Sequence, residues 1–454
     1  MEGVERHLAS VAASVRWNEL PDSTRRESVR AVLDYLAAAI AGYRFGEIRP
    51  ALARVVPGDL RGEASLIGSK KRASLSDAVL FNGTMGHAVE MDDGERLGAA
   101  HIGSVVVPVA LALGAHLGRS GPEVLEAIVA GYEVMVRISS AVAPSHTIRG
   151  FHPTGYCGTF GAATAAARLL RLPERGIHAA LGTAGLLGAG LLEVDRSGQM
   201  MKPLHAGRAA EAGLLAARLA EAGAEGPVEI LSGPRGFGQA VADAVNWDCI
   251  MAGRTDVPWA IEARYIKPYP TCRHIHVPID LGLRVHRELH PRAEDILSIH
   301  ISTYSHALRE TGQIKSPVTA AMARFSMAYC VASAIVRGSL TNEDLMPEAL
   351  RDDTVLALAQ RVQVTLGEKQ EAGYPEGRPN AMRVELADGS VTLEAKFPTG
   401  EQENPLSDTG LDQKVRTCCG SAIESTRVEQ LIRAVRALPE AAVCPDLPAI
   451  CSVN

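Results

Sequence analysis

The sequence predicts a mainly α fold with an inserted α+β domain. From the start to about residue 264, apolar residues recur at spacings of three and four, which is the period of a helix. After Lys267 the pattern changes to alternation, and from about Asp408 it returns to helical spacing. We therefore expect a large all-helical domain built from both chain ends, residues 1–264 and 404–454, and a smaller α+β domain of residues 265–403.

The first part of the chain carries clear helix signals. The start signal Leu20-Pro21-Asp22-Ser23 precedes one apolar stripe, which consists of Val29, Leu33, Leu36 and Ile40. Similar patterns predict helices from Pro122 to Val142 and from Ala209 to Ala222. Their many alanines indicate closely spaced helices, because small side chains let helix axes approach each other.

Alternating apolar residues predict strands in the middle of the chain. Two such runs are Leu297, Ile299, Ile301 with Thr303, and Val362, Val364 with Leu366. A hairpin is predicted around Asp388-Gly389, since both residues tolerate the positive φ of a tight turn, and it pairs Val384 and Leu386 with Val391 and Leu393. Between these strands we expect one helix over about Val318 to Val336, with a stripe of Met322, Phe325, Tyr329 and Ala332.

The composition excludes several classes of protein. A chain of 454 residues with 46% hydrophobic residues is long enough for two domains of an ordinary globular protein. Its net charge of −6 argues against nucleic acid or an anionic membrane as a partner. The eight cysteines form no CxxC pair, and the first residues lack the pattern of a signal peptide. We therefore expect reduced thiols, a cytoplasmic location and no transmembrane segment.

An ionisable run interrupts two apolar helical patterns between Asn82 and Pro108. Its charged members are His87, Glu90, Asp92, Asp93, Glu95 and His101. Four carboxylates this close together raise one another's pKa if they are buried, so the run is either a solvated surface loop or an acid–base site. Small residues such as Gly98 and Gly103 favour the site, because they let the backbone approach a ligand. We expect the following apolar helix to start through Pro108.

Three further segments carry residues suited to chemistry. His152 lies in a glycine-rich bend before an alanine-rich helix, whose first N–H groups favour an anion. Lys202 precedes another helix and can bind a carboxylate or exchange protons, whereas we expect His205 and Arg208 to be structural. Lys267 stands near the predicted domain junction, where ligand sites are common. Taken singly, each of these residues is equally typical of a helix cap or a solvated loop.

Cys272, His274 and His276 form an alternating set that fits two interpretations. If the segment is a strand, the three side chains share one face and supply the thiolate and imidazole ligands that zinc prefers. A proline-rich loop without metal explains the same residues equally well. We expect no metal site here.

The motifs of the chain resemble those of the MmgE/PrpD family. The acidic run, the block GYEVMVRISSAVAPSHTIRGFHPTGYCGTFGAA from Gly131, the block QMMKPLHAGRAAEAG from Gln199 and the block IKPYPTCRHIHVPID from Ile266 each match a segment of the family pattern. The resemblance extends over nearly the whole chain. It implies a helical domain from both chain ends with an α+β lid, proton chemistry on a small polycarboxylate, no cofactor, and a homodimer.

The resemblance also implies site residues. The expected catalytic residues are His101, His152, Asp92 and Lys202, and the expected substrate-binding residues are Lys267, Asp93, Glu90, His276 and Cys272. Removing a proton α to a carboxylate needs a positioned base and cations that stabilise the enediolate. The two histidines with Asp92 suit the first task, and the two lysines suit the second.

Two departures from the family pattern bear on the reaction. Cys272 stands where decarboxylase-like members have histidine, and Gly94 stands where members usually have threonine. We therefore expect a 2-methylcitrate-type dehydratase (a hydro-lyase) first, an iminodisuccinate-type epimerase (an isomerase) second, and a cis-aconitate-type decarboxylase third. A catalytically silent binding relative is the alternative from another class.

Overall fold

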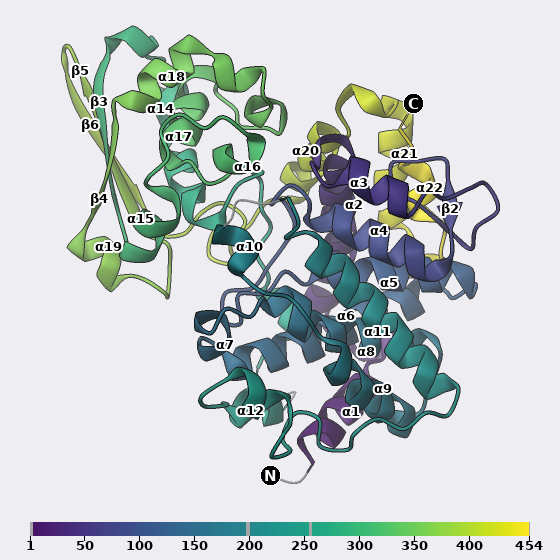
Figure 1. Ribbon diagram of the computed structural model, residues 1–454. Helices are drawn as coiled ribbons and strands as arrows, with labels where there is room; N and C mark the ends of the chain where they lie inside the picture. Colours follow the sequence, from purple (N-terminus) through teal and green to yellow (C-terminus); the bar gives the residue numbers. More distant parts are fainter. Residues whose placement is uncertain (1–2, 197–199, 254–256, 454) are drawn as a thin grey trace. The chain divides into compact units, whose positions relative to one another are not determined.

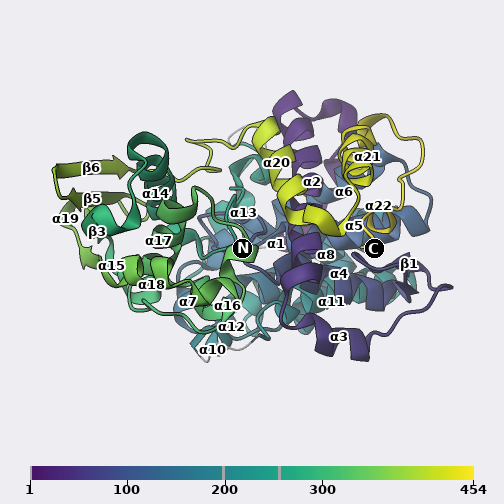
Figure 2. The same cartoon turned by 90° about the horizontal axis from the view of Figure 1, so that it is seen from above.

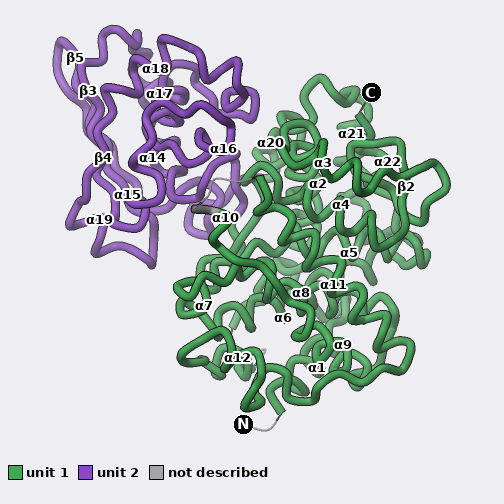
Figure 3. Tube along the Cα trace, viewed as in Figure 1, with its two compact units in different colours: residues 1–265, 408–454 green, residues 266–407 purple. Residues whose placement is uncertain are grey.

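The computed structural model describes residues 3–196, 200–253 and 257–453, and the chain divides into two compact units. Unit 1 consists of Met1–Tyr265 and Asp408–Asn454, and unit 2 consists of Ile266–Ser407 (Figure 3). The fold is mainly α, with a small mixed sheet in unit 2 (Figure 1). Among the described residues, no helix has both the length and the apolar character needed to cross a membrane.

Unit 1 is a bundle of helices joined by loops and one short hairpin of β1 (Ala64–Ser65) and β2 (Arg72–Ala73). Its helices are α1 Val4–Ser14, α2 Asp22–Phe45, α3 Arg49–Val55, α4 Leu75–His87, α5 Gly103–His116, α6 Gly121–Val142, α7 Ser145–Ile148, α8 Pro153–Leu169, α9 Glu174–Leu187, α10 Glu193–Arg196, α11 Leu204–Glu221, α12 Phe237–Val241, α13 Trp247–Met251, α20 Asp408–Cys419, α21 Ser425–Arg436 and α22 Leu447–Ile450. The predicted stripe on α2 is confirmed, since Leu33, Leu36 and Ile40 are buried.

Small residues let the central helices of unit 1 approach closely. Helix α11 packs against both α4 and α8. At Gly207 of α11, an added Cβ atom would lie only 2.2 Å from the carbonyl oxygen of Leu80 and 2.2 Å from Oγ1 of Thr84, both in α4. This close approach places the start of α11 beside the end of α4, and it explains the alanine- and glycine-rich sequence of α11.

Helix α5 begins earlier than the sequence predicts. We expected it to start through Pro108, but α5 begins at Gly103 and Pro108 lies inside it. The N–H group of Gly103 donates to Oδ1 of Asp93 at 2.8 Å, so a buried carboxylate caps the helix five residues before the proline. The prediction failed because the cap comes from a residue ten positions earlier in the chain, which no local signal reveals.

Unit 2 contains a four-stranded sheet with the order β4-β3-β5-β6. Strand β3 (Ile296–Thr303) pairs in parallel with β4 (Val362–Leu366) and antiparallel with β5 (Asn380–Leu386), which pairs with β6 (Gly389–Ala395). Figures 1 and 2 both show α14 (His276–Leu289) and α17 (Met327–Arg337) on one face of this sheet. The remaining helices of unit 2 are α15 Ser305–Thr311, α16 Ala320–Ala323, α18 Asp353–Gln360 and α19 Glu368–Ala372.

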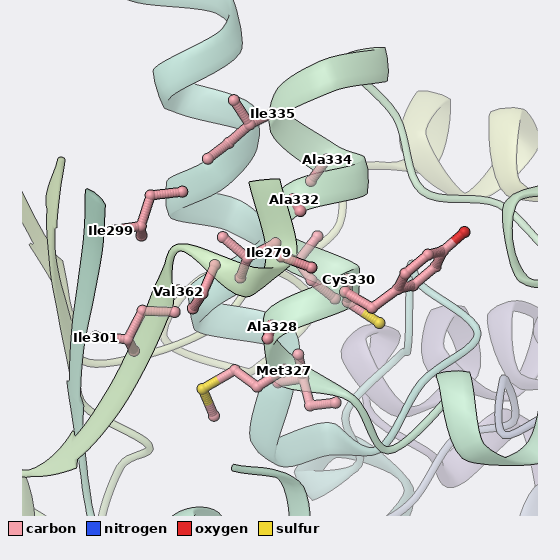
Figure 4. Packing of buried hydrophobic residues seen from close by; sticks show 14 of the residues in the cluster. Ile279, Ile299, Ile301, Met327, Ala328, Cys330, Ala332, Ala334, Ile335 and Val362 are labelled. Carbon is pink, nitrogen blue, oxygen red and sulfur yellow. The ribbon is translucent and has the colours of Figure 1, made fainter. Parts of the chain in front are cut away.

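The core of unit 2 lies between the sheet and these two helices. Ile299 and Ile301 of β3 and Val362 of β4 meet Ile279 of α14 and Met327 of α17 (Figure 4). This arrangement fits the predicted α+β character, because a sheet with one apolar face needs helices to cover it.

Two predicted details of the sheet are corrected. We expected Leu297 on the buried face, but its side chain is 60% exposed, because the register of β3 against β5 shifts between Ile296 and Ser298 and puts Ile296 inside instead. The hairpin is present as predicted, but Val384 pairs with Val391 and Met382 pairs with Leu393. However, its two turn residues are 387 and 388, one position earlier than we expected, because Leu386 pairs with Gly389.

The single helix predicted over about Val318 to Val336 is wrong. The segment forms two helices, α16 and α17, which are separated at Ser326. The hydroxyl of Ser326 accepts a hydrogen bond from the N–H group of Tyr329 and donates one to the carbonyl of Ile314. A side chain that caps a new helix competes with continuation of the old one, so the apolar stripe is broken here.

We predict that Gly207→Ala lowers the free energy of unfolding by about 1–3 kcal/mol, because the new methyl group cannot fit against α4 without moving it. Urea denaturation of the purified variant measures this change. Leu215→Ala is the matched control, since Leu215 lies on the same helix and is 48% exposed. Equal stability of the Gly207 variant and the parent protein would show that α4 and α11 are less closely fitted than described.

Candidate active site

The acidic loop, residues 88–102, connects α4 to α5 in unit 1. Its carboxylates are not solvated: Asp92 is 0% exposed, Asp93 and Glu95 are each 2% exposed, and Glu90 is 9% exposed. The interpretation of this run as a charged surface loop is therefore wrong. Carboxylates buried in this way need hydrogen bonds or cations, and these partners define the site.

Asp92 joins two histidines at the centre of the acidic loop. Its Oδ2 atom lies 2.9 Å from Nδ1 of His87 and 3.6 Å from Nδ1 of His101. Nδ1 of His101 also lies 2.7 Å from the backbone carbonyl of Asp93. A carbonyl only accepts hydrogen bonds, so this nitrogen carries a proton, and in the neutral form of the ring the lone pair is on Nε2. His101 therefore has the tautomer of a general base.

His152 and His205 continue the row of rings from His101 and His87. The centroids of His87 and His101 are 4.8 Å apart, those of His87 and His152 are 5.8 Å apart, and Nδ1 of His152 lies 3.0 Å from Nδ1 of His205. His152 directly precedes α8 and is 3% exposed. Burial holds the pKa of His152 well below its ordinary value, and the nearby Lys202 lowers this pKa further. His152 is therefore neutral and can accept one proton.

Lys202 and Glu90 form an ion pair at the edge of this row. Nζ of Lys202 donates to Oε1 of Glu90 at 2.8 Å, and their side chains are 17% and 12% exposed. Glu90 has a φ of 54°, which is uncommon for a residue with a Cβ atom and is typical of functional loops. The backbone thus adopts a less favourable conformation that brings this carboxylate to the lysine.

Asp93 points into the protein rather than along the row of histidines. Its Oδ2 atom accepts from the hydroxyl of Tyr132 at 2.7 Å and lies 3.9 Å from NH1 of Arg264, while Oδ1 caps α5 at Gly103. Burial raises the pKa of Asp93 to about 6, although Arg264 acts in the opposite direction. Both oxygens of Asp93 are therefore used inside unit 1.

Glu95 forms a turn in the second half of the acidic loop. Its carboxylate accepts from the backbone N–H groups of Leu97 and Gly98, each at 2.7 Å. Its own N–H group donates to the carbonyl of Ala100, next to His101. Burial raises the pKa of Glu95 from its ordinary value of 4.5 to about 7, against the effect of these hydrogen bonds. This turn sets the path of the chain into His101.

Gly94 is explained by its neighbour Tyr265. The two residues exchange backbone hydrogen bonds, at 3.3 Å from Gly94 N–H and 2.8 Å from Tyr265 N–H. An added Cβ at Gly94 would lie 2.3 Å from the hydroxyl of Tyr265. The tyrosine thus occupies the space that a threonine at this position would need, so the departure from the family pattern is compensated locally.

The expected residues of unit 2 form a second cluster. NH1 of Arg273 lies 2.9 Å from Nδ1 of His276, and Nε2 of His276 lies 3.3 Å from the carbonyl of Thr271. Because arginine only donates and a carbonyl only accepts, both nitrogens of this buried ring are used within unit 2. Burial lowers the pKa of His276 well below its ordinary value, and the neighbouring Arg273 and Lys267 lower it further. His276 is therefore neutral, in a cationic surrounding.

The alternating set of Cys272, His274 and His276 does not lie on a strand. Cys272 precedes a short 3₁₀ helix, Arg273–Ile275, and His276 begins α14. Nδ1 of His274 is hydrogen-bonded to the hydroxyl of Tyr304 at 2.6 Å. Successive turns of helix rotate side chains away from one face, so the strand interpretation of a shared metal site is wrong.

A different trio in the described residues has the geometry of metal ligands. Ligand atoms of His87, Asp92 and His101 all lie within 4.8 Å of one another. Two imidazoles and a carboxylate with an open position are typical of catalytic zinc. However, hydrogen bonds already engage Nδ1 of both rings, with Asp92 and with the carbonyl of Asp93. The two Nδ1 atoms are thus engaged as in an acid–base group, whereas the buried Nε2 of His87 has no hydrogen-bond partner among the described residues.

Sequence reasoning missed part of this site. His205 was expected to be structural, yet it contacts His152, and His87 was noted in the acidic run without a role. The signal was present, because His205 lies in the first turn of α11, only three positions after Lys202, which directly precedes that helix and its N-cap. Tyr132 and Arg264 gave no local signal at all, since each contacts Asp93 from a distant segment.

Comparisons with known proteins show which family this chain matches. The model of the MmgE/PrpD N-terminal domain matches residues 6–250, and that of the MmgE/PrpD C-terminal domain matches residues 269–440. The chain belongs to the MmgE/PrpD family. Similar family members include the cis-aconitate decarboxylase of Aspergillus terreus, which is 25% identical over 452 residues covering 94% of this chain and 92% of that protein. The cis-aconitate decarboxylase of Homo sapiens is 25% identical over 467 residues, covering 98% and 94%.

We predict that Glu95→Gln changes how stability depends on pH. The unfolded carboxyl ionises near pH 4.5 and the folded one near pH 7, so in this interval the folded state binds more protons and the parent protein loses stability as pH rises. The variant lacks this loss, and its stability relative to the parent should rise by about 3 kcal/mol between pH 4.5 and pH 7. Urea denaturation at several pH values measures the difference. The exposed Glu225→Gln serves as control, and a pH-independent difference for Glu95→Gln would contradict the prediction.

We predict that activity survives chelation, because Nδ1 of His87 and Nδ1 of His101 are already engaged by Asp92 and by the carbonyl of Asp93. The purified protein is dialysed against a chelator, its metal content is measured, and turnover is compared before and after. If turnover disappears and one divalent ion restores it, the trio is a metal site and its role as an acid–base group is incorrect.

Proposed function

We propose that this protein is a lyase that acts on a small polycarboxylate through proton transfer at the carbon α to a carboxylate. The observation that carries the proposal is the geometry of His101, whose Nδ1 is fixed by the carbonyl of Asp93 and whose Nε2 keeps its lone pair. Asp92, 3.6 Å from the same ring, stabilises the imidazolium that forms when Nε2 takes a proton. A ring that is held in this way and is only 12% exposed is suited to a weak carbon acid.

The other site residues fit the same chemistry. His152 supplies a second neutral ring in the row, suited to move a proton on the other side of the reacting carbon. Lys202 supplies the cation that stabilises an enediolate, and a substrate carboxylate replaces Glu90 as its partner. We propose Lys267 as a further ligand of a substrate carboxylate, together with Cys272. Asp93 and His276 are better suited to positioning, since both already use their polar atoms internally.

The relatives affect the choice among reactions. The family members compared above are named cis-aconitate decarboxylases. One of the two objections to that reaction was Gly94, and Tyr265 compensates for it. We therefore propose two reactions with equal rank, decarboxylation of a cis-aconitate-like acid and dehydration of a methylcitrate-like acid. Epimerisation of an iminodisuccinate-like acid ranks below both. A cytoplasmic homodimer remains part of the proposal.

Turnover in deuterated water tests the proposal and separates the reactions. The purified protein is offered cis-aconitate, methylcitrate, citrate and iminodisuccinate, and products are read by mass spectrometry. Decarboxylation adds one deuterium to each product molecule, epimerisation adds one at the inverted carbon, and forward dehydration gives an unlabelled alkene. A hydrolytic product, or one formed by hydride transfer, would sink the proposal, and absence of turnover on all four acids would favour the silent relative.

We predict that His101→Asn lowers kcat by a factor of about 10² to 10⁴ while the protein stays folded, because asparagine keeps a polar shape and exchanges no proton near neutral pH. His290→Asn is the matched control: His290 is exposed, and asparagine tolerates its φ of 46°. A His101 variant that keeps kcat within about threefold of the parent would mean that this ring only supports the acidic loop.

A further inference from the structure

Helix α20 brings a buried lysine to the acidic loop from the C-terminal segment of unit 1. The helix packs against α2, as Figures 1 and 2 also show. Lys414 of α20 is only 5% exposed, and its ammonium group donates to Oδ1 of Asp34 at 2.5 Å and to the carbonyl of Met91 at 2.7 Å. No step of the proposed reaction uses this cation, so its burial needs another explanation.

Met91 is held twice by the same face of α20. Besides the bond from Lys414 to its carbonyl, the sulfur of Met91 lies 3.6 Å from Sγ of Cys418. Lys414 and Cys418 are four positions apart, so they are neighbours on one side of the helix. Since Met91 directly precedes Asp92, its carbonyl belongs to the peptide group that carries the Asp92 N–H, and fixing it fixes the backbone from which Asp92 projects.

A second set of contacts fixes the acidic loop immediately after Asp92 and Asp93. Gly94 exchanges two backbone hydrogen bonds with Tyr265, and Arg264 lies 3.9 Å from Asp93. Asp92 and Asp93 thus lie between one anchor supplied by α20 and another supplied by the segment at Tyr265. Displacements of less than 1 Å matter here, because Asp92 contacts His87 at 2.9 Å and His101 at 3.6 Å.

We propose that Lys414 is a positioning residue for the acid–base pair of Asp92 and His101, a role that rests on the function proposed above. It holds the Met91 carbonyl so that Asp92 reaches both histidines. Asp34 is its counter-charge and allows the ammonium to be buried. Lys414 therefore acts on the reaction through Asp92, without contact with the substrate.

The test separates positioning from simple stabilisation. Lys414→Met alone leaves the buried Asp34 without its main cation and is expected to destabilise the fold. The double variant Asp34→Asn, Lys414→Met removes one negative and one positive charge together, which leaves Arg264 opposite Asp93. Arg416→Met is the matched control: it lies on the same helix, and its ion pair with Glu429 is about 40% exposed on both sides.

We expect the double variant to recover the thermal stability lost in Lys414→Met, yet to keep a kcat at least about tenfold below the parent with a nearly unchanged KM. When Asp92 moves away from His101 in the double variant, the imidazolium of His101 loses stabilisation. The pKa on the acid side of the kcat/KM profile should therefore fall by about 1. Hydrogen exchange of the peptide spanning residues 88–103 should be faster than in the parent, while Arg416→Met leaves all readouts unchanged.

Parental kcat, pH profile and loop exchange in the double variant would overturn the proposal and leave Lys414 a stabilising residue only. Failure of the proposed proton-transfer function is recognised by a separate result, which is full activity of the His101→Asn variant. In that case fast exchange of the loop in the double variant would still report loss of the anchor, but Lys414 would have no catalytic pair to position and the proposal would fall with the function.

Discussion

Four carboxylates buried within six residues are the constraint on which the rest of unit 1 depends. Each must have a partner of its own, because an unpaired buried charge costs several kcal/mol. Asp92 has His87, Asp93 has Tyr132 and Arg264, Glu90 has Lys202, and Glu95 has backbone N–H groups. Helices α4 and α6, the segment before α11 and the segment at Tyr265 each supply one of these partners, so unit 1 surrounds this loop with them.

This constraint also shapes the chemistry of the row of histidines. Burial keeps His152 neutral, and the carbonyl of Asp93 selects the tautomer of His101, so two rings stand ready to accept protons. The one ion pair at the edge of the row joins Lys202 to Glu90. In the proposed function, an anionic substrate group replaces Glu90 as the partner of Lys202.

Local patterns predicted the elements of this fold better than the contacts between them. The stripe of Leu33, Leu36 and Ile40 on α2 and the hairpin of β5 and β6 follow from periods of 3.6 and 2, and the structure has both. The start of α5 was misplaced because its cap, Asp93, lies ten positions upstream, and Leu297 was put on the wrong face by a register shift. His101 and His152 stand out in the sequence beside glycines. Arg264 and Lys414 do not, since their partners are far away in the chain and a buried cation has no local signature.

The return of α20 to unit 1 has a consequence for the order of folding. Asp34 and Met91 obtain their contact with Lys414 only after the ribosome has passed through all of unit 2, residues 266–407. Until then Asp34 lacks Lys414, the nearer of its two cationic neighbours, and has only Arg264 at 3.9 Å. Long-range contacts of this kind slow folding and leave apolar surface exposed during synthesis. Helices made after unit 2 thus complete a domain whose other helices are made before it.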